Sequence, residues 1–102
     1  MLIKIKTQED VGLIDCTYKD ILITGTGYNT IAAISENGRA QTLGIYKNTE
    51  EALKVLKTIE TAIEFQQNAD ILTKNFNSIL IIKMPEEGEI ENDIRKQESR
   101  TI

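Results

Sequence analysis

The chain has 102 residues, of which 40% are hydrophobic, and it carries a formal net charge of −4. This length fits one domain with a core of modest stability. The acidic balance disfavours direct binding to nucleic acid, because surfaces that bind nucleic acid are usually basic. The chain has no histidine and one cysteine, which excludes an internal disulfide and Cys/His zinc sites and removes the commonest general base.

The sequence also argues against a membrane protein. No apolar run approaches the roughly 20 residues that a membrane-spanning helix needs. The amino-terminal segment lacks the continuous apolar region of a signal peptide, so a cytoplasmic location is expected. Cys16 alternates with Ile14 and Tyr18 along a predicted strand and is interpreted as a small buried residue, with a reactive thiol as the alternative.

The first half of the chain reads as about five antiparallel strands, because their connections are too short for crossover helices. The predicted strands cover 1–7, 12–18, 20–26, 30–35 and 40–46. The pair Asn37-Gly38 predicts a two-residue hairpin loop between the last two strands. Gly25 and Gly27 lack the third glycine and the following helix of a dinucleotide fingerprint, so they indicate a bulge or turn.

The stretch from Asn48 to about Phe65 predicts one long amphipathic helix. Its apolar face consists of Ala52, Val55, Leu56, Ile59, Ala62 and Ile63. Asn48 is expected to cap the helix, and Glu51 is expected to reach back in a capping box. A short second helix is expected from Ala69, followed by a strand over 78–84 that Pro85 ends.

Together these elements predict an α+β fold: an antiparallel sheet of about five to six strands with the long helix packed across it. Residues 1–86 are expected to form a single domain, and residues 87–102 a charged C-terminal tail. The apolar run 79–82 has no alternation, which suits a strand covered on both faces or one at a subunit boundary.

No arrangement of residues points to catalysis. The chain has neither a Ser/His/Asp nor a Cys/His set, and it has no Walker motif. Lys83 in its apolar strand could act as a base if burial lowered its pKa, but it is interpreted as an edge lysine that faces water. We therefore expect a protein that is not an enzyme and uses no cofactor or metal.

Binding of a nucleotide has better candidates. A nucleotide needs a flat apolar surface for its base and cationic donors for its phosphates. The candidate binding residues are Tyr28, Tyr46 and Phe76 for the base and Arg39, Lys83, Arg95 and Arg100 for the phosphates. The alternative is that the aromatic residues pack in the core and that the cations are ordinary scattered surface charges.

Three short motifs resemble a group of small proteins common in phages and prophages of Gram-positive bacteria. They are Leu13-Ile14-Asp15-Cys16-Thr17-Tyr18, Leu43-Gly44-Ile45-Tyr46-Lys47-Asn48-Thr49-Glu50 and Met84-Pro85-Glu86-Glu87. The chain departs from the group's pattern at residues 7–10, where the group has a Gly-containing turn, and at Cys16-Thr17, where Val-Pro is usual.

Small phage proteins of this size and layout include the Thoeris anti-defence sponges. The resemblance implies a homo-oligomer that sequesters a cyclic nucleotide or ADP-ribose-type immune signal without catalysis, in pockets near subunit boundaries. A different hypothesis is an acidic protein-binding inhibitor of a host defence effector, similar to an anti-CRISPR protein, whose tail steers it to a basic partner. A structural or interaction module of a phage is the third hypothesis.

Overall fold

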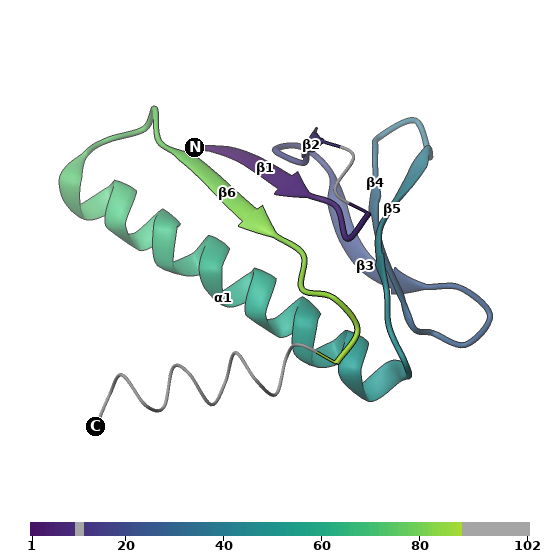
Figure 1. The fold of residues 1–102 in the computed structure, drawn as a ribbon. Helices are drawn as coiled ribbons and strands as arrows, with labels where there is room; N and C mark the ends of the chain where they lie inside the picture. The colour runs from purple at the N-terminus through teal and green to yellow at the C-terminus, as the bar shows by residue number, and fades with distance from the viewer. Residues whose placement is uncertain (10–11, 89–102) are drawn as a thin grey trace, which may run out of the picture.

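The computed structural model describes residues 1–9 and 12–88. Along these residues the elements are β1 (Leu2–Lys6), β2 (Leu13–Asp15), β3 (Asp20–Thr24), β4 (Thr30–Ile34), β5 (Ala40–Ile45), α1 (Thr49–Thr73) and β6 (Ile79–Lys83) (Figure 1). The predicted α+β class is confirmed. Of the predicted C-terminal tail, residues 89–102 lie outside the described residues, so the tail stays a prediction.

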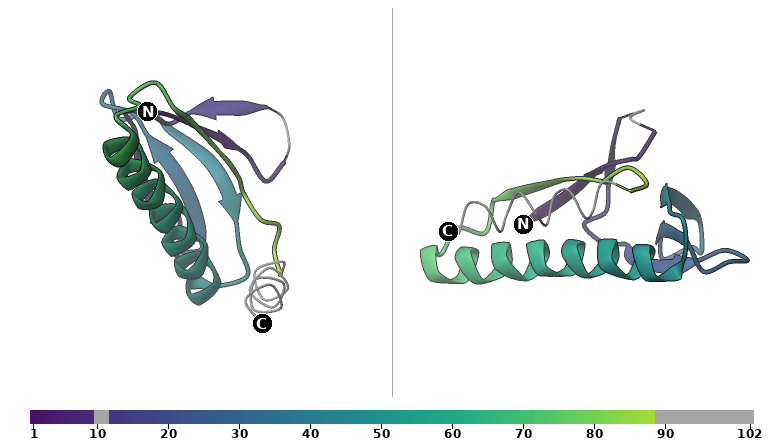
Figure 2. Two further views of the ribbon diagram at one scale, coloured as in Figure 1. Left: turned by 90° about the vertical axis from the view of Figure 1, so that its left-hand side faces the viewer. Right: turned by 60° about the horizontal axis from the view of Figure 1, so that its bottom comes forward.

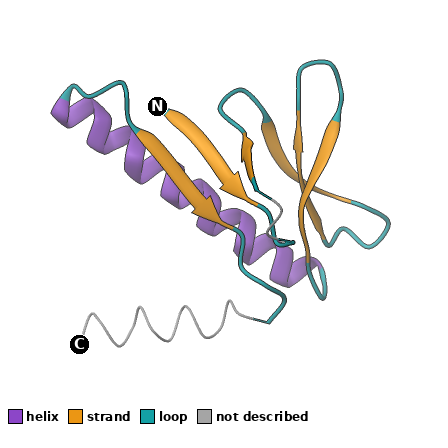
Figure 3. Ribbon diagram, turned by 45° about the horizontal axis from the view of Figure 1, so that its top comes forward, coloured by secondary structure: helices purple, strands orange, loops and turns teal. Residues whose placement is uncertain are grey.

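The six strands form two separate three-stranded sheets, so the predicted single antiparallel sheet is wrong (Figure 3). One sheet has the order β2-β1-β6 and the other has the order β3-β4-β5. The first sheet is mixed, because β1 pairs with β2 antiparallel and with β6 parallel. Parallel strands need a long connection, and here it contains β2 to β5 and then α1, which returns the chain to the start of β1.

The break between the sheets lies just after β2. The backbone N–H of Cys16 still donates to the carbonyl of Ile3 in β1, at 2.8 Å. The carboxylate of Asp15 then accepts from the N–H of Thr17 at 3.0 Å, which turns the chain out of the sheet. β3 therefore starts a new sheet instead of pairing with β2.

Helix α1 starts as predicted and ends later than predicted. The Asn48 side chain accepts from the N–H of Glu51 at 2.9 Å, which confirms the cap. The predicted capping box is wrong, because the Glu51 carboxylate accepts instead from the N–H of Gly88, at 2.7 Å. The helix continues past Phe65 to Thr73 without a second helix from Ala69, and 25 residues form one rod.

The helix lies along one side of the strands (Figure 2). Its predicted face is confirmed: Ala52, Val55 and Ile59 are buried, and Leu56 and Ile63 pack against them. The other buried residues of this core are Ile3, Ile5, Cys16, Ile31, Ala33, Leu43, Tyr46 and Met84. Both sheets thus share one core with α1, and burial of Cys16 agrees with its prediction as a small core residue.

Gln8 joins the two sheets. Its backbone N–H donates to the carbonyl of Leu43 at 2.8 Å. Its side-chain amide accepts from the N–H of Ile45 at 2.8 Å and donates to the carbonyl of the same residue at 3.0 Å. These bonds connect the segment that follows β1 to the end of β5. They hold the two sheets together, although no strand of one sheet pairs with a strand of the other.

Asp70 is a buried carboxylate near the end of α1, with 6% of its surface exposed. It accepts hydrogen bonds from the Ser78 hydroxyl at 2.5 Å and from the Gln66 amide at 2.9 Å. These two bonds, led by that of Ser78, hold the pKa of Asp70 below its ordinary value of 3.8. Asp70 therefore ties the end of the helix to the segment that leads into β6.

The Asp70→Asn variant is expected to lower the free energy of unfolding at neutral pH. A carboxylate whose pKa is lower in the folded state stabilises the fold above its unfolded pKa, and this stabilisation is lost as the pH falls through the folded pKa. The difference between wild type and variant should therefore shrink below about pH 4. Urea unfolding at several pH values measures it.

Glu64→Gln is the matched control, because Glu64 is an exposed carboxylate on the same helix. This variant is expected to unfold like the wild type at every pH. A difference between wild type and Asp70→Asn that stays constant from pH 7 to pH 3 would contradict a role for the Asp70 charge.

Candidate functional site

The residues predicted to bind a ligand lie on separate parts of the fold. Tyr28 lies in the turn between β3 and β4, and Arg39 lies between β4 and β5. Phe76 lies between α1 and β6, and Lys83 ends β6. All four are exposed. The structure therefore does not gather them into one site, although it leaves each of them accessible.

Tyr46 belongs to the core, as the packing alternative predicted. It is 1% exposed, and its hydroxyl donates to the carbonyl of Pro85 at 2.7 Å. Its backbone carbonyl accepts from the Asn29 amide at 2.9 Å. The ring is therefore not available as a surface for a base, which corrects its expected role in binding.

Arg95 and Arg100 lie outside the described residues, so their expected phosphate-binding role stays a prediction. The same is true of the hypothesis that an acidic tail inhibits a defence effector, because most of that tail lies beyond Gly88.

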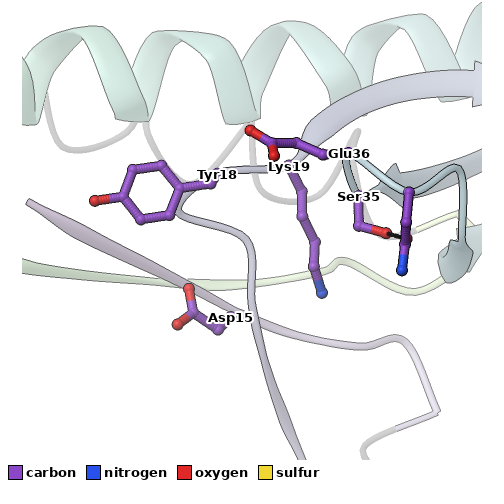
Figure 4. A pocket seen from close by; sticks show the side chains of 6 residues that line it. Asp15, Tyr18, Lys19, Ser35 and Glu36 are labelled. Carbon is purple, nitrogen blue, oxygen red and sulfur yellow. Dashed lines mark hydrogen bonds between the residues drawn. The ribbon is translucent and has the colours of Figure 1, made fainter.

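A surface hollow lies between the turn that follows β2 and the hairpin that joins β4 to β5 (Figure 4). It has a volume of about 530 Å³ and is lined by Asp15, Tyr18, Lys19, Ser35, Glu36 and Asn37. A second hollow of about 430 Å³ shares Lys19 and Ser35 with it and extends to Arg39, Ala40 and Gln41. We call the two together the hairpin hollow.

The turn after β2 forms one wall of the hairpin hollow. The Asp15 carboxylate accepts from the Thr17 hydroxyl at 2.6 Å as well as from its N–H. These two bonds lower the pKa of Asp15, so it is a carboxylate at neutral pH. The N–H of Lys19 donates to the carbonyl of Cys16 at 3.2 Å and closes the turn. Tyr18 projects from its tip and is 87% exposed.

The β4–β5 hairpin forms the other wall. The N–H of Gly38 donates to the carbonyl of Ser35 at 2.9 Å, and the N–H of Ser35 donates to the carbonyl of Arg39 at 3.0 Å. This pattern leaves three residues in the loop, with φ of 82° at Gly38. The hairpin prediction is thus confirmed, but its two-residue loop is wrong, because Asn37 does not adopt a positive φ.

One contact connects the two walls directly. The Lys19 ammonium donates to the side-chain oxygen of Gln41 at 2.8 Å. In Figure 4 the Glu36 carboxylate extends toward the Tyr18 side of the hairpin hollow. The hollow thus contains an exposed ring, two cations (Lys19 and Arg39) and two carboxylates (Asp15 and Glu36).

These groups suit recognition of a nucleotide. An exposed tyrosine offers a face on which a base can stack. Lysine and arginine bind phosphate oxygens, and carboxylates accept hydrogen bonds from ribose hydroxyls. Among the described residues, no group of three or more Asp, Glu or Cys side chains could hold a metal ion.

Of the residues around the hairpin hollow, the sequence predicted Arg39 and missed Tyr18, Lys19 and Asp15. The sequence pattern predicts that Tyr18 belongs to a strand, in alternation with Cys16. The strand ends at Asp15 because the following Thr17 bonds to its carboxylate. The missed signal was an Asp-x-Thr turn directly before an aromatic residue and a lysine, which places both at a loop tip.

No protein-family model, curated protein or solved structure matches this chain. The resemblance to phage proteins therefore stays an expectation that rests on the three short motifs. Within the described residues, the single helix α1 is too polar to span a membrane.

Proposed function

We propose that this protein is a non-catalytic binding protein that captures a nucleotide of the ADP-ribose type in the hairpin hollow. The observation that carries the proposal is that exposed Tyr18 lines one hollow with Lys19, and that Lys19 also lines the adjoining hollow with Arg39. A base, a diphosphate and ribose hydroxyls each have a matching group there.

Each group has a distinct role in this proposal. The Tyr18 ring stacks on the base, and stacking tolerates different bases because each has a flat face. Lys19 and Arg39 neutralise the phosphates, with Arg39 able to form a two-pronged contact. Asp15 and Glu36 accept hydrogen bonds from ribose hydroxyls.

The motif resemblance supports a biological setting for this binding. In that setting the protein is a phage anti-defence protein in the cytoplasm of the host cell. It holds an immune signal of the cyclic nucleotide or ADP-ribose type away from its effector. A sponge of this kind needs tight binding and no chemistry.

Calorimetric titration of the purified protein with ADP-ribose and cyclic ADP-ribose tests the proposal. Binding of at least one of them is expected. Because stacking contributes about 1–3 kcal/mol per base, Tyr18→Ala should weaken binding roughly 5- to 150-fold. Arg39→Gln should also weaken it and reduce its dependence on salt, because one cation fewer contacts phosphate.

Tyr28→Ala is the matched control. Tyr28 is also an exposed tyrosine, at 65%, but it lies in the β3–β4 turn and does not line the hairpin hollow. The Tyr28→Ala variant should bind the nucleotides with the same affinity as the wild type. No binding to either nucleotide, or equal losses in Tyr18→Ala and Tyr28→Ala, would refute a nucleotide site in the hairpin hollow.

A further inference from the structure

Within the residues that the structure describes, strand β6 forms an open edge of the first sheet, beside β1 (Figure 1). It has five residues, and it contains neither a proline nor a charge before Lys83 at its end. Ile79 and Ile81 are 59% and 60% exposed. Natural edges are usually protected by charges, prolines, bulges or short length, and β6 has none of these along most of its length.

The opposite edge of the same sheet is protected. Strand β2 has three residues, and the charged residue Asp15 ends it. The contrast between the two edges suggests that β6 is an edge that another strand covers.

The backbone of β6 shows which of its groups face outward. The carbonyl of Ser78 accepts from the N–H of Leu2 at 2.8 Å, and the N–H of Met84 donates to the carbonyl of Lys6 at 3.0 Å. Because Leu2 and Lys6 belong to β1, these groups of Ser78 and Met84 point toward β1. The direction of these groups alternates along a strand. The N–H and C=O groups of Ile79, Ile81 and Lys83 therefore point away from β1, toward the open edge.

We propose that β6 pairs antiparallel with β6 of a second copy of this chain, with the two-fold axis at Ile81. In this register Ile81 faces Ile81 of the second copy, and Ile79 faces Lys83. The outward groups of the two strands then form about six main-chain hydrogen bonds. Each copy contributes the same surface, as a symmetric dimer requires.

Charge placement favours a second copy paired in this way. The lysines at the two strand ends lie at opposite ends of the paired strands, so no two like charges face each other. A parallel pairing in register would instead place Lys83 against Lys83. The aliphatic stem of Lys83 can cover Ile79 of the second copy while its ammonium stays in water.

The side chains of the outer face fit the same arrangement. Leu2 is 43% exposed and lies beside Ile79 in the register of β1 and β6. Antiparallel pairing joins Leu2, Ile79 and Ile81 of both copies into one apolar strip across the axis. The dimer therefore covers apolar surface as well as backbone groups, and both favour association.

Sedimentation velocity over a range of protein concentrations tests the dimer. The wild type should show a monomer–dimer equilibrium that shifts toward the dimer as concentration rises. Ile81→Pro should be monomeric, because it removes an outward N–H that the chain's own sheet does not use. Ile81→Lys should be monomeric too, because two lysines would face each other at the axis.

Leu13→Lys is the matched control, because Leu13 is 51% exposed on the other edge of the same sheet. It should dimerise like the wild type. An equal mixture of Ile81→Lys and Ile81→Glu should restore dimers, since opposite charges then face each other. This mixture keeps the test decisive if Ile81→Pro does not fold.

A wild type that stays monomeric throughout the concentration range would overturn the proposal. So would a dimer that persists in both Ile81→Pro and Ile81→Lys, because the contact would then lie elsewhere. Dimers in the mixture of the two charged variants, with monomers in each alone, would confirm that residue 81 faces residue 81 of the second copy, as the proposed axis requires.

Discussion

Replacing Ile59 by aspartate is expected to unfold the domain at 25 °C. Ile59 is 2% exposed in the middle of α1 and belongs to the core that both sheets share with the helix. The substitution loses about 2–5 kcal/mol of apolar packing, and it also buries a charge without a partner. Domains of this kind have only about 5–15 kcal/mol of stability.

Circular dichroism and urea unfolding measure the effect, and Leu53→Asp is the matched control. Leu53 lies on the same helix but is 54% exposed, so its carboxylate stays in water. This variant should fold and lose less than about 1 kcal/mol. If Ile59→Asp kept the helical signal and a cooperative transition, the buried face of α1 would have been assigned wrongly.

The start and the buried face of α1 could be predicted from the sequence, because both depend on local features. The side chain of Asn48 bonds three residues ahead, and apolar residues recur at helical spacing. The end could not be predicted in the same way. The buried stripe continues to Asp70, which resembles a surface residue until the hydrogen bonds that it accepts from Gln66 and Ser78 are seen.

The arrangement of the strands depends on contacts between distant segments. Most strands were predicted close to their positions, since alternation and turn residues are local signals. The pairing of β1 with β6 joins the two ends of the described chain, and the sequence of neither strand indicates which strand it will pair with. The bonds of Gln8 to Ile45 likewise join the two sheets, and no local pattern around Gln8 indicates them.

In the candidate site, too, local features could be predicted from the sequence and contacts between distant segments could not. Arg39 could be predicted only as one of several cations able to contact phosphates, and the sequence does not distinguish it from Lys83, which lies elsewhere on the fold. Tyr18 and Lys19 were missed because their importance comes from a hairpin about twenty residues away, which faces them across the hollow. Tyr46 was proposed for the site because an aromatic residue in a sequence gives no sign of whether it is buried.

Replacing Tyr46 by alanine is expected to destabilise the domain by about 3–5 kcal/mol, the usual cost of deleting a large buried ring. Tyr46→Phe keeps the ring and removes the hydroxyl that donates to Pro85, so it should cost about 1 kcal/mol. Urea unfolding separates the two variants. Similar losses in both would mean that the hydrogen bond, rather than ring packing, dominates the contribution of Tyr46.

A substitution at Gly44 tests the packing of the Tyr46 ring by crowding it instead of removing it. A Cβ atom at Gly44 would lie 2.8 Å from the Tyr46 hydroxyl and 3.0 Å from its ring, so Gly44→Ala should displace the ring and destabilise the wild type. In the Tyr46→Ala background the ring is gone and the added methyl group has room. Gly44→Ala should then cost much less, and the difference measures the coupling between the two residues.

Equal costs of Gly44→Ala in both backgrounds would contradict the close packing of Gly44 on Tyr46. If the proposed nucleotide site is correct, Tyr46→Phe should leave nucleotide affinity unchanged, whereas Tyr18→Ala should weaken it. Tyr46 stabilises the junction where β5 and Pro85 meet. Tyr18 is the tyrosine whose ring is free to contact a ligand in the hairpin hollow.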